Sequence, residues 1–224
     1  MRIQAVVFDL FETLVTERDA PVRRASALAN QLGVDERAYK REWKALRPEI
    51  VLGHLTFCEA LKRIAATLGG VVDEAVLERL RAERVAQKAE VLRRIEPHIL
   101  GVVRTLRGRG QKLCVVTNAF AEDVAGWDGS PLRSFFDIAV FSYAVRLAKP
   151  DPAIYLEACR ALGVIPHRAL FVGDGVEEVA GAGAAGLAAS RALWFASRVP
   201  NTTVQRDDPG FWHIGEVVDA ALAA

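Results

Sequence analysis

Five short apolar segments alternate along the chain with longer segments of helical periodicity. The apolar segments are continuous and rich in Val, Ile and Phe, which is typical of parallel strands buried on both faces. They cover residues 3–8, 113–117, 138–141, 169–172 and 189–195, the last being the weakest. Helical segments separate the last four. The pattern therefore predicts an α/β fold in which βαβ units form an open parallel sheet.

Residues 16–95, between the first and second predicted strands, form a region with almost no strand signal. Leucine and isoleucine recur there at helical spacings, and Gly33, Gly53 and the Gly69–Gly70 pair divide the region into about four helices. The chain of 224 residues is longer than one average domain of about 150 residues. We therefore predict a core made of residues 1–15 and 96–224, with residues 16–95 inserted as an all-helical unit.

One helix of the predicted core has explicit boundary signals. Asp151 is a favourable N-cap, Pro152 suits the first helical position, and Gly163 suits the left-handed residue that follows a helix. The sequence therefore predicts a helix between Asp151 and Gly163.

Composition and charge exclude several classes of protein. The chain is 51% apolar and 25% charged, unlike disordered or fibrous chains, and its net charge of +1 argues against a nucleic-acid binder. Cys58, Cys114 and Cys159 are too dispersed for a disulfide framework or a zinc site. We find no signal peptide or membrane span. We therefore expect a cytoplasmic protein, monomer or homodimer, with a small-molecule substrate and neither nucleic-acid nor membrane partners.

Polar side chains stand where several predicted strands end. Asp9 follows the first strand, Thr117 and Asn118 end the second, and Asp174 follows the fourth, while Lys149 precedes the helix at Asp151. Ligands of open α/β sheets bind at the carboxyl ends of the strands. The sequence therefore predicts one site that holds two carboxylates, a hydroxyl and an ammonium group.

These residues lie in four motifs, FDLFETL, VTN, KPDPAIY and VGDG, which occur in this order. Together they resemble the motifs of the haloacid dehalogenase superfamily of hydrolases, and the resemblance covers nearly the whole chain. It implies a Rossmann-like parallel sheet as the core. It also implies that the helical insertion is a cap of the C1 type, placed directly after the first motif.

The resemblance also implies roles for the motif residues. Asp9 would be a nucleophile that forms a covalent ester, which water then hydrolyses. Mg²⁺ would bind to Asp9, to Asp174 and to the backbone carbonyl of Phe11. Thr117 and Lys149 would complete the catalytic set. The ammonium group of Lys149 would help to hold the Asp9 carboxyl group ionised.

Further residues are expected near the substrate. Phe11, Thr13 and Asn118 are assigned to substrate binding, and Thr13 is expected to order the loop around Asp9 through its hydroxyl group. Glu178 follows Asp174 by four residues and either supports the metal or is an ordinary acid in the first turn of a helix. The role of Glu177 is open in the same way.

The cap offers weaker candidates. Arg23, Arg24, Trp43 and His54 are possible substrate contacts, although a solvated or packed side chain is the favoured interpretation of each. Three other tryptophans are expected to pack in the core or at its edge: Trp127, Trp194 and Trp212.

Phe11 departs from the phosphatase pattern, in which an Asp two residues after the nucleophile protonates the leaving group. Such catalysis is worth about 10²- to 10⁴-fold in rate, and phenylalanine cannot supply it. We do not expect Glu12 to replace this acid, because adjacent residues point in different directions. Dehalogenases of the superfamily carry an aromatic residue here, since a halide leaves without a proton.

Three interpretations therefore remain open. Asp174 favours a magnesium-dependent hydrolase of small phosphate monoesters, which is our first choice. Phe11 favours a 2-haloacid dehalogenase or another carbon-centred hydrolase. A weakly active or non-catalytic binding protein with the same fold is the third.

Overall fold

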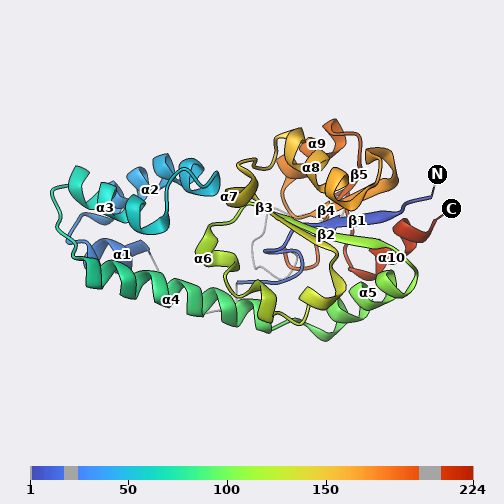
Figure 1. Cartoon of the computed structure of the whole chain (residues 1–224), viewed down its shortest axis with the longest axis horizontal. Helices are drawn as coiled ribbons and strands as arrows, with labels where there is room; N and C mark the ends of the chain where they lie inside the picture. The colour runs from blue at the N-terminus through green and yellow to red at the C-terminus, as the bar shows by residue number, and fades with distance from the viewer. Residues whose placement is uncertain (1, 18–24, 197–207, 224) are drawn as a thin grey trace.

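The computed structural model describes residues 2–17, 25–196 and 208–223, and it confirms the parallel sheet (Figure 1). The five strands are all parallel and lie in the order β3-β2-β1-β4-β5. The weakest predicted strand is shorter than expected and ends at residue 191 instead of 195. The strands are β1 (Ala5–Phe8), β2 (Lys112–Thr117), β3 (Ile138–Phe141), β4 (Ala169–Gly173) and β5 (Ala188–Arg191).

Helices cover both faces of the sheet, which explains why its strands are continuously apolar. Val6 and Phe8 of β1 point into a hydrophobic cluster shared with α5 (Pro97–Gly108) and α10 (Gly215–Leu222). Ala5 and Val7 point into a second cluster shared with α8 (Pro152–Leu162) and α9 (Val176–Ala184). Figure 1 shows α8 and α9 on one side of the sheet and α5 and α10 on the other.

Short helical segments complete the described part of the core. They are α6 (Ala121–Val124), α7 (Ser142–Val145) and three 3₁₀ turns at Trp127–Gly129, Arg133–Phe135 and Pro166–Arg168.

The insertion is all-helical, as predicted, and its described part contains four helices, drawn at the left and along the bottom of Figure 1. They have their own hydrophobic cluster, and Gly33 and Gly53 follow two of them with φ values of 67° and 69°. The expected cap on a parallel-sheet core is therefore confirmed, whereas its boundaries near residues 15 and 96 stay predictions. The helices are α1 (Ala25–Gln31), α2 (Glu36–Val51), α3 (Phe57–Thr67) and α4 (Glu74–Arg93).

Two of the contacts between cap and core are especially close. At the first, α4 packs on the segment after α6 so closely that a Cβ atom on Gly126 would lie 2.7 Å from the Cβ of Ala89. At the second, the end of α2 meets α7. The hydroxyl group of Ser142 donates to the carbonyl of Val51 at 2.7 Å, and a Cβ on Gly53 would overlap the carbonyl of Tyr143. These contacts fix the cap over one edge of the sheet.

The boundary signals of α8 act as predicted. The Asp151 carboxylate accepts a hydrogen bond from the backbone N–H of Ala153, and Gly163 is left-handed with a φ of 63°. Trp127 and Trp194 are buried and Trp212 is half-buried, as expected of packing residues. Within the ranges described, no helix is both long enough and apolar enough to cross a membrane.

Candidate functional site

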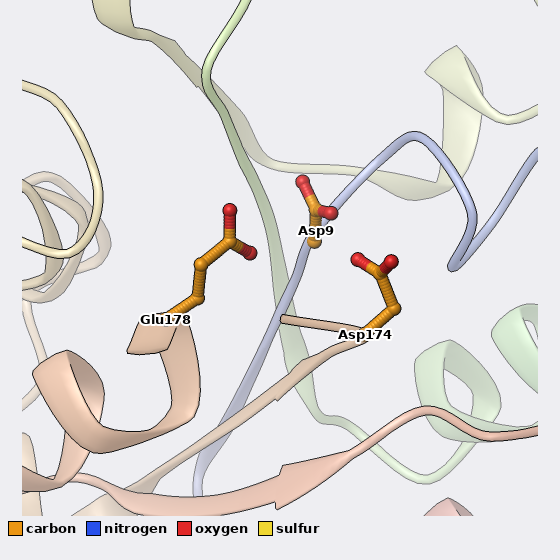
Figure 2. A group of neighbouring side chains, drawn as sticks. All are labelled: Asp9, Asp174 and Glu178. Atoms are coloured by element: carbon orange, nitrogen blue, oxygen red, sulfur yellow. The ribbon is translucent and has the colours of Figure 1, made fainter. Parts of the chain in front are cut away.

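The carboxyl edge of the sheet brings the predicted residues together. Asp9 directly follows β1, Thr117 is the last residue of β2, and Asp174 directly follows β4. Figure 2 shows the carboxylates of Asp9, Asp174 and Glu178 directed toward a common space, with Glu178 reaching it from the first turn of α9. One oxygen from each of these three groups lies within 4.8 Å of the others.

Lys149 connects two of these acids. Its Nζ atom lies 2.5 Å from Oδ1 of Asp9 and 2.8 Å from Oε2 of Glu178, and its side chain is 1% exposed. A buried ammonium group needs such partners, because desolvation without compensation would favour its neutral form. The charged form of Lys149 therefore depends on its two acidic partners, Asp9 and Glu178.

Two neighbours hold Lys149 and Glu178 in place. The Asn118 side chain accepts from the backbone N–H of Lys149 and donates to its carbonyl, both at 2.8 Å. A Cβ on Gly181 would overlap the carbonyl of Pro150, so glycine lets α9, which carries Glu178, approach the lysine loop. Asn118 thus positions Lys149, and its contact with the substrate stays a prediction.

The electrostatics of the site are dominated by burial. Burial raises the pKa of Asp9, and the Lys149 ammonium opposes that rise without cancelling it. Burial also raises the pKa of Asp174, aided by the Glu178 charge, and it raises the pKa of Glu178. For Lys149, burial alone would lower the pKa, but the Asp9 and Glu178 carboxylates outweigh it, so the pKa is raised. One buried acid, Asp9, and two half-buried acids therefore share one ammonium group.

This donor set fits a divalent cation. Mg²⁺ is held by a small number of carboxylates together with other oxygen atoms, and three converging carboxylates beside one ammonium leave an excess of negative charge. The Phe11 carbonyl accepts no backbone hydrogen bond within the described ranges, so it is free for the predicted role as ligand. Glu178 belongs to this cluster, whereas Glu177 is exposed.

The Phe11 side chain lies in a different environment. Nζ of Lys88, on cap helix α4, lies 4.4 Å from the centre of its ring. Lys88 also pairs with Glu17 at 2.5 Å and lies 3.7 Å from Asp123 of α6. The position of the missing acid is therefore in contact with a cap residue that the sequence did not single out.

Glu12 does not fill the role of that acid. It is left-handed, with a φ of 58°, and its carboxylate accepts hydrogen bonds from the Thr16 hydroxyl and the backbone N–H of Glu17. Glu12 therefore orders its own loop, in agreement with the expectation that it is no substitute for the acid.

Thr13 orders the loop in another way than predicted. It is fully buried, and its carbonyl accepts a hydrogen bond from the indole of Trp194 at 2.9 Å. Its hydroxyl group has no hydrogen-bond partner among the residues described. Its backbone carbonyl, and not the expected hydroxyl group, makes the hydrogen bond that ties this loop to the core.

The cap residues named as possible substrate contacts do not join this cluster where the structure describes them. Arg23 and Arg24 lie outside the described residues. Trp43 stacks on Tyr39 at 6.0 Å and contacts other rings edge-on, so it packs, and exposed His54 pairs with Glu49. The interpretation of Trp43 as packing and His54 as a surface side chain agrees with these contacts.

Comparison with known proteins agrees with this arrangement. The model of a family described as haloacid dehalogenase-like hydrolase matches residues 3–186. The chain belongs to this family. It is therefore a hydrolase, and the resemblance seen in its four motifs is confirmed.

Relatives within this family differ in their reactions. N-acetylmuramic acid 6-phosphate phosphatase of Pseudomonas aeruginosa is 29% identical, over 98% of this chain and 92% of that protein. (S)-2-haloacid dehalogenase 4A of Burkholderia cepacia is 25% identical, over 81% of this chain and 79% of its own length. A 2-haloacid dehalogenase structure from Pseudomonas syringae pv. Tomato matches with a TM-score of 0.69 and 24% identity, covering 97% of both chains. Membership of the family therefore leaves the reaction of this chain open.

Proposed function

We propose that this hydrolase cleaves small phosphate monoesters with the help of Mg²⁺ and uses Asp9 as its covalent nucleophile. One observation carries the proposal: the buried carboxylate of Asp9 and two half-buried carboxylates converge beside a single buried ammonium group. Such an imbalance suits a cation and an anionic phosphoryl group better than it suits a neutral carbon centre. A relative that is named as a phosphatase over nearly the full chain supports the same choice.

The chemistry divides among the residues of the site. A carboxylate oxygen of Asp9 attacks phosphorus, the bond to the leaving oxygen breaks, and water then hydrolyses the aspartyl phosphate. Lys149 favours the ionised form of Asp9 and offsets the negative charge of the phosphoryl group, and Thr117 donates its hydroxyl to a phosphoryl oxygen. Mg²⁺ held by Asp9, Asp174 and the Phe11 carbonyl would neutralise phosphoryl charge.

The absence of an acid at position 11 has a chemical consequence. No side chain at Phe11 can protonate the departing oxygen, so the leaving group must depart as an anion or take its proton from water. We therefore expect a steep dependence of kcat on the pKa of the leaving alcohol. Aryl phosphates should be cleaved much faster than alkyl phosphates.

A second candidate is a 2-haloacid dehalogenase, which Phe11 favours. Asp9 would then attack the carbon that carries the halogen, the halide would leave with the bonding electrons, and water would hydrolyse the ester. That reaction needs no proton donor and no metal, so it leaves the convergence of Asp174 and Glu178 unexplained. A non-catalytic role would leave the burial of Asp9 against Lys149 without a use.

A parallel assay separates these candidates. Phosphate release from p-nitrophenyl phosphate and halide release from 2-chloropropionate are measured with Mg²⁺ and with a chelator, for the wild type and for Asp9→Asn. We expect phosphate release that needs both Mg²⁺ and Asp9. Halide release insensitive to the chelator would establish the second candidate, and the absence of both activities would refute the proposed function.

A further inference from the structure

One face of cap helix α2 is directed toward the core. Trp43, Arg47 and Val51 follow one another at intervals of four residues, so their side chains lie on the same side of the helix. The ring of Trp43 meets the ring of Phe120 edge-on at 5.8 Å, and Phe120 follows the second motif of the core. At the other end, the carbonyl of Val51 accepts a hydrogen bond from Ser142 of α7.

Arg47 lies between these two contacts and yet remains exposed. Its guanidinium makes no hydrogen bond or ion pair with the residues that the structure describes. Because the residues one turn before it and one turn after it meet the core, Arg47 stands on the core-facing side of α2. An arginine in that place is available to a ligand.

The space that Arg47 overlooks adjoins the catalytic cluster. Ala148, which directly precedes Lys149, packs against the hydrophobic cluster of the cap that includes Ile50 and Val51. The lysine loop therefore lies beneath this end of α2. Burial raises the pKa of Glu178, and the charge of Arg47 is among those that oppose this rise, which is consistent with that placement.

We infer that Arg47 binds a second anionic group of the substrate, a carboxylate or a second phosphate, while the reacting phosphoryl group lies at Asp9. A guanidinium group presents a planar fork of N–H donors that matches such oxyanions in a bidentate manner. The acid-rich cluster would repel a second negative charge, and Arg47 is a cation placed to offset that repulsion. The inference rests on the proposed function for the reaction at Asp9. The binding of an anion by Arg47 does not depend on that function.

The test compares substrates that differ only in the second group. They are 2-phosphoglycolate, with a carboxylate, ethylene glycol bisphosphate, with a second phosphate, and 2-hydroxyethyl phosphate, which has neither. Arg47→Gln should lower kcat/KM about 10- to 100-fold for the substrate whose second anion it binds, mainly through KM, since a hydrogen bond to a charged group contributes that much. For 2-hydroxyethyl phosphate, the change should stay below about twofold.

Two variants control the experiment. Arg47→Lys keeps the charge without the planar fork and should recover part of the loss. Arg63→Gln removes an exposed arginine from cap helix α3 and should leave all three substrates unaffected. A loss on the carboxylate alone, or on the bisphosphate alone, supports the inference and identifies the anion. Equal effects of Arg47→Gln on all three substrates would overturn it.

A binding arm keeps this test separate from the proposed function. Binding of 2-phosphoglycolate and of the bisphosphate to Asp9→Asn in Mg²⁺ is measured by calorimetry, with and without Arg47→Gln. If the wild type hydrolyses phosphate esters but Arg47→Gln changes neither turnover nor binding, the inference fails while the proposed function stands. If no ester is hydrolysed but Arg47→Gln weakens binding tenfold, the proposed function fails and the inference stands.

Discussion

Two partly buried charge clusters lie close to the first motif, and their charges are balanced in different ways. At the carboxyl edge of the sheet, Lys149 pairs with Asp9 and Glu178, and the third acid, Asp174, has no ion pair within the described part of the chain. At the junction of cap and core, Asp123 lies 2.6 Å from Arg84 and 3.7 Å from Lys88, which pairs in turn with Glu17. Two acids there face two bases.

The comparison indicates which cluster is functional. Buried charges are costly unless they are paired, so a balanced cluster is complete by itself and can serve as a structural contact. An excess of partly buried carboxylates is tolerable only with a further cation or with raised pKa values, and burial raises the pKa of all three acids. The acid-rich cluster therefore has capacity to bind a ligand, whereas the balanced one fastens the cap to the core.

Asp9→Asn is the change with the largest expected effect, because an amide cannot act as the nucleophile. We expect kcat to fall by at least about 10⁴-fold, the range seen when a nucleophile is removed. Steady-state kinetics measures this, and circular dichroism checks that the variant is folded. Turnover within tenfold of the wild type would show that the acid-rich cluster does not perform the chemistry.

Phe11→Asp should increase phosphatase activity, because it restores a proton donor. We expect a rise of up to about 10²-fold for alkyl phosphates, the lower part of the range for general acid catalysis. The new carboxyl would meet Lys88, which would hold it ionised, so Phe11→Asp combined with Lys88→Met should gain more than Phe11→Asp alone. If kcat for alkyl phosphates does not rise in either variant, the missing acid is not what limits the rate.

Asp123→Asn should destabilise the fold and spare the chemistry. The Asp123 side chain is 8% exposed, while Arg84 and Lys88 are 24% and 14% exposed, so the two bases would lose their partner in a partly buried place. We expect a loss of about 2 kcal/mol in the free energy of unfolding, below the value for a fully buried pair. Urea unfolding measures it. A fall in kcat as large as that of Asp9→Asn would instead make this cluster catalytic.

The smallest expected effect is a dependence of stability on pH. The pKa values of Asp9, Asp174 and Glu178 are raised in the folded protein, so their contribution to stability is present below the ordinary carboxyl pKa of about 4 and is lost as the pH rises through the raised values. In a chelator, the Tm should therefore decrease above about pH 4. Mg²⁺ should restore the Tm, and more so at higher pH, because ligands must be deprotonated. A Mg²⁺ effect that shrinks with rising pH would contradict this account.

The sequence predicted the part of the site that depends on the sheet. Asp9, Thr117 and Asp174 stand at strand ends, and parallel strands bring those ends to one edge whatever the side chains do elsewhere. Lys149 was also predicted, from its motif beside the helix cap at Asp151.

Residues that depend on how the cap packs could not be predicted in this way. Lys88 lies on α4, whose polar and apolar residues are spread around the helix, so its sequence does not show which side meets the core. Arg47 could be placed on the core-facing side of α2 only from the contacts that Trp43 and Val51 make on either side of it. Asn118 was identified, but its hydrogen bonds to Lys149 depend on a loop 31 residues away.

The central claim is that the acid-rich cluster is a cation site and the balanced cluster is not, and a Mg²⁺ titration followed by calorimetry tests it most directly. We predict that the wild type binds one Mg²⁺, that Asp174→Asn weakens this binding at least tenfold, and that Asp123→Asn leaves it unchanged. Absence of Mg²⁺ binding to the wild type, or equal binding to the wild type and Asp174→Asn, would contradict the account.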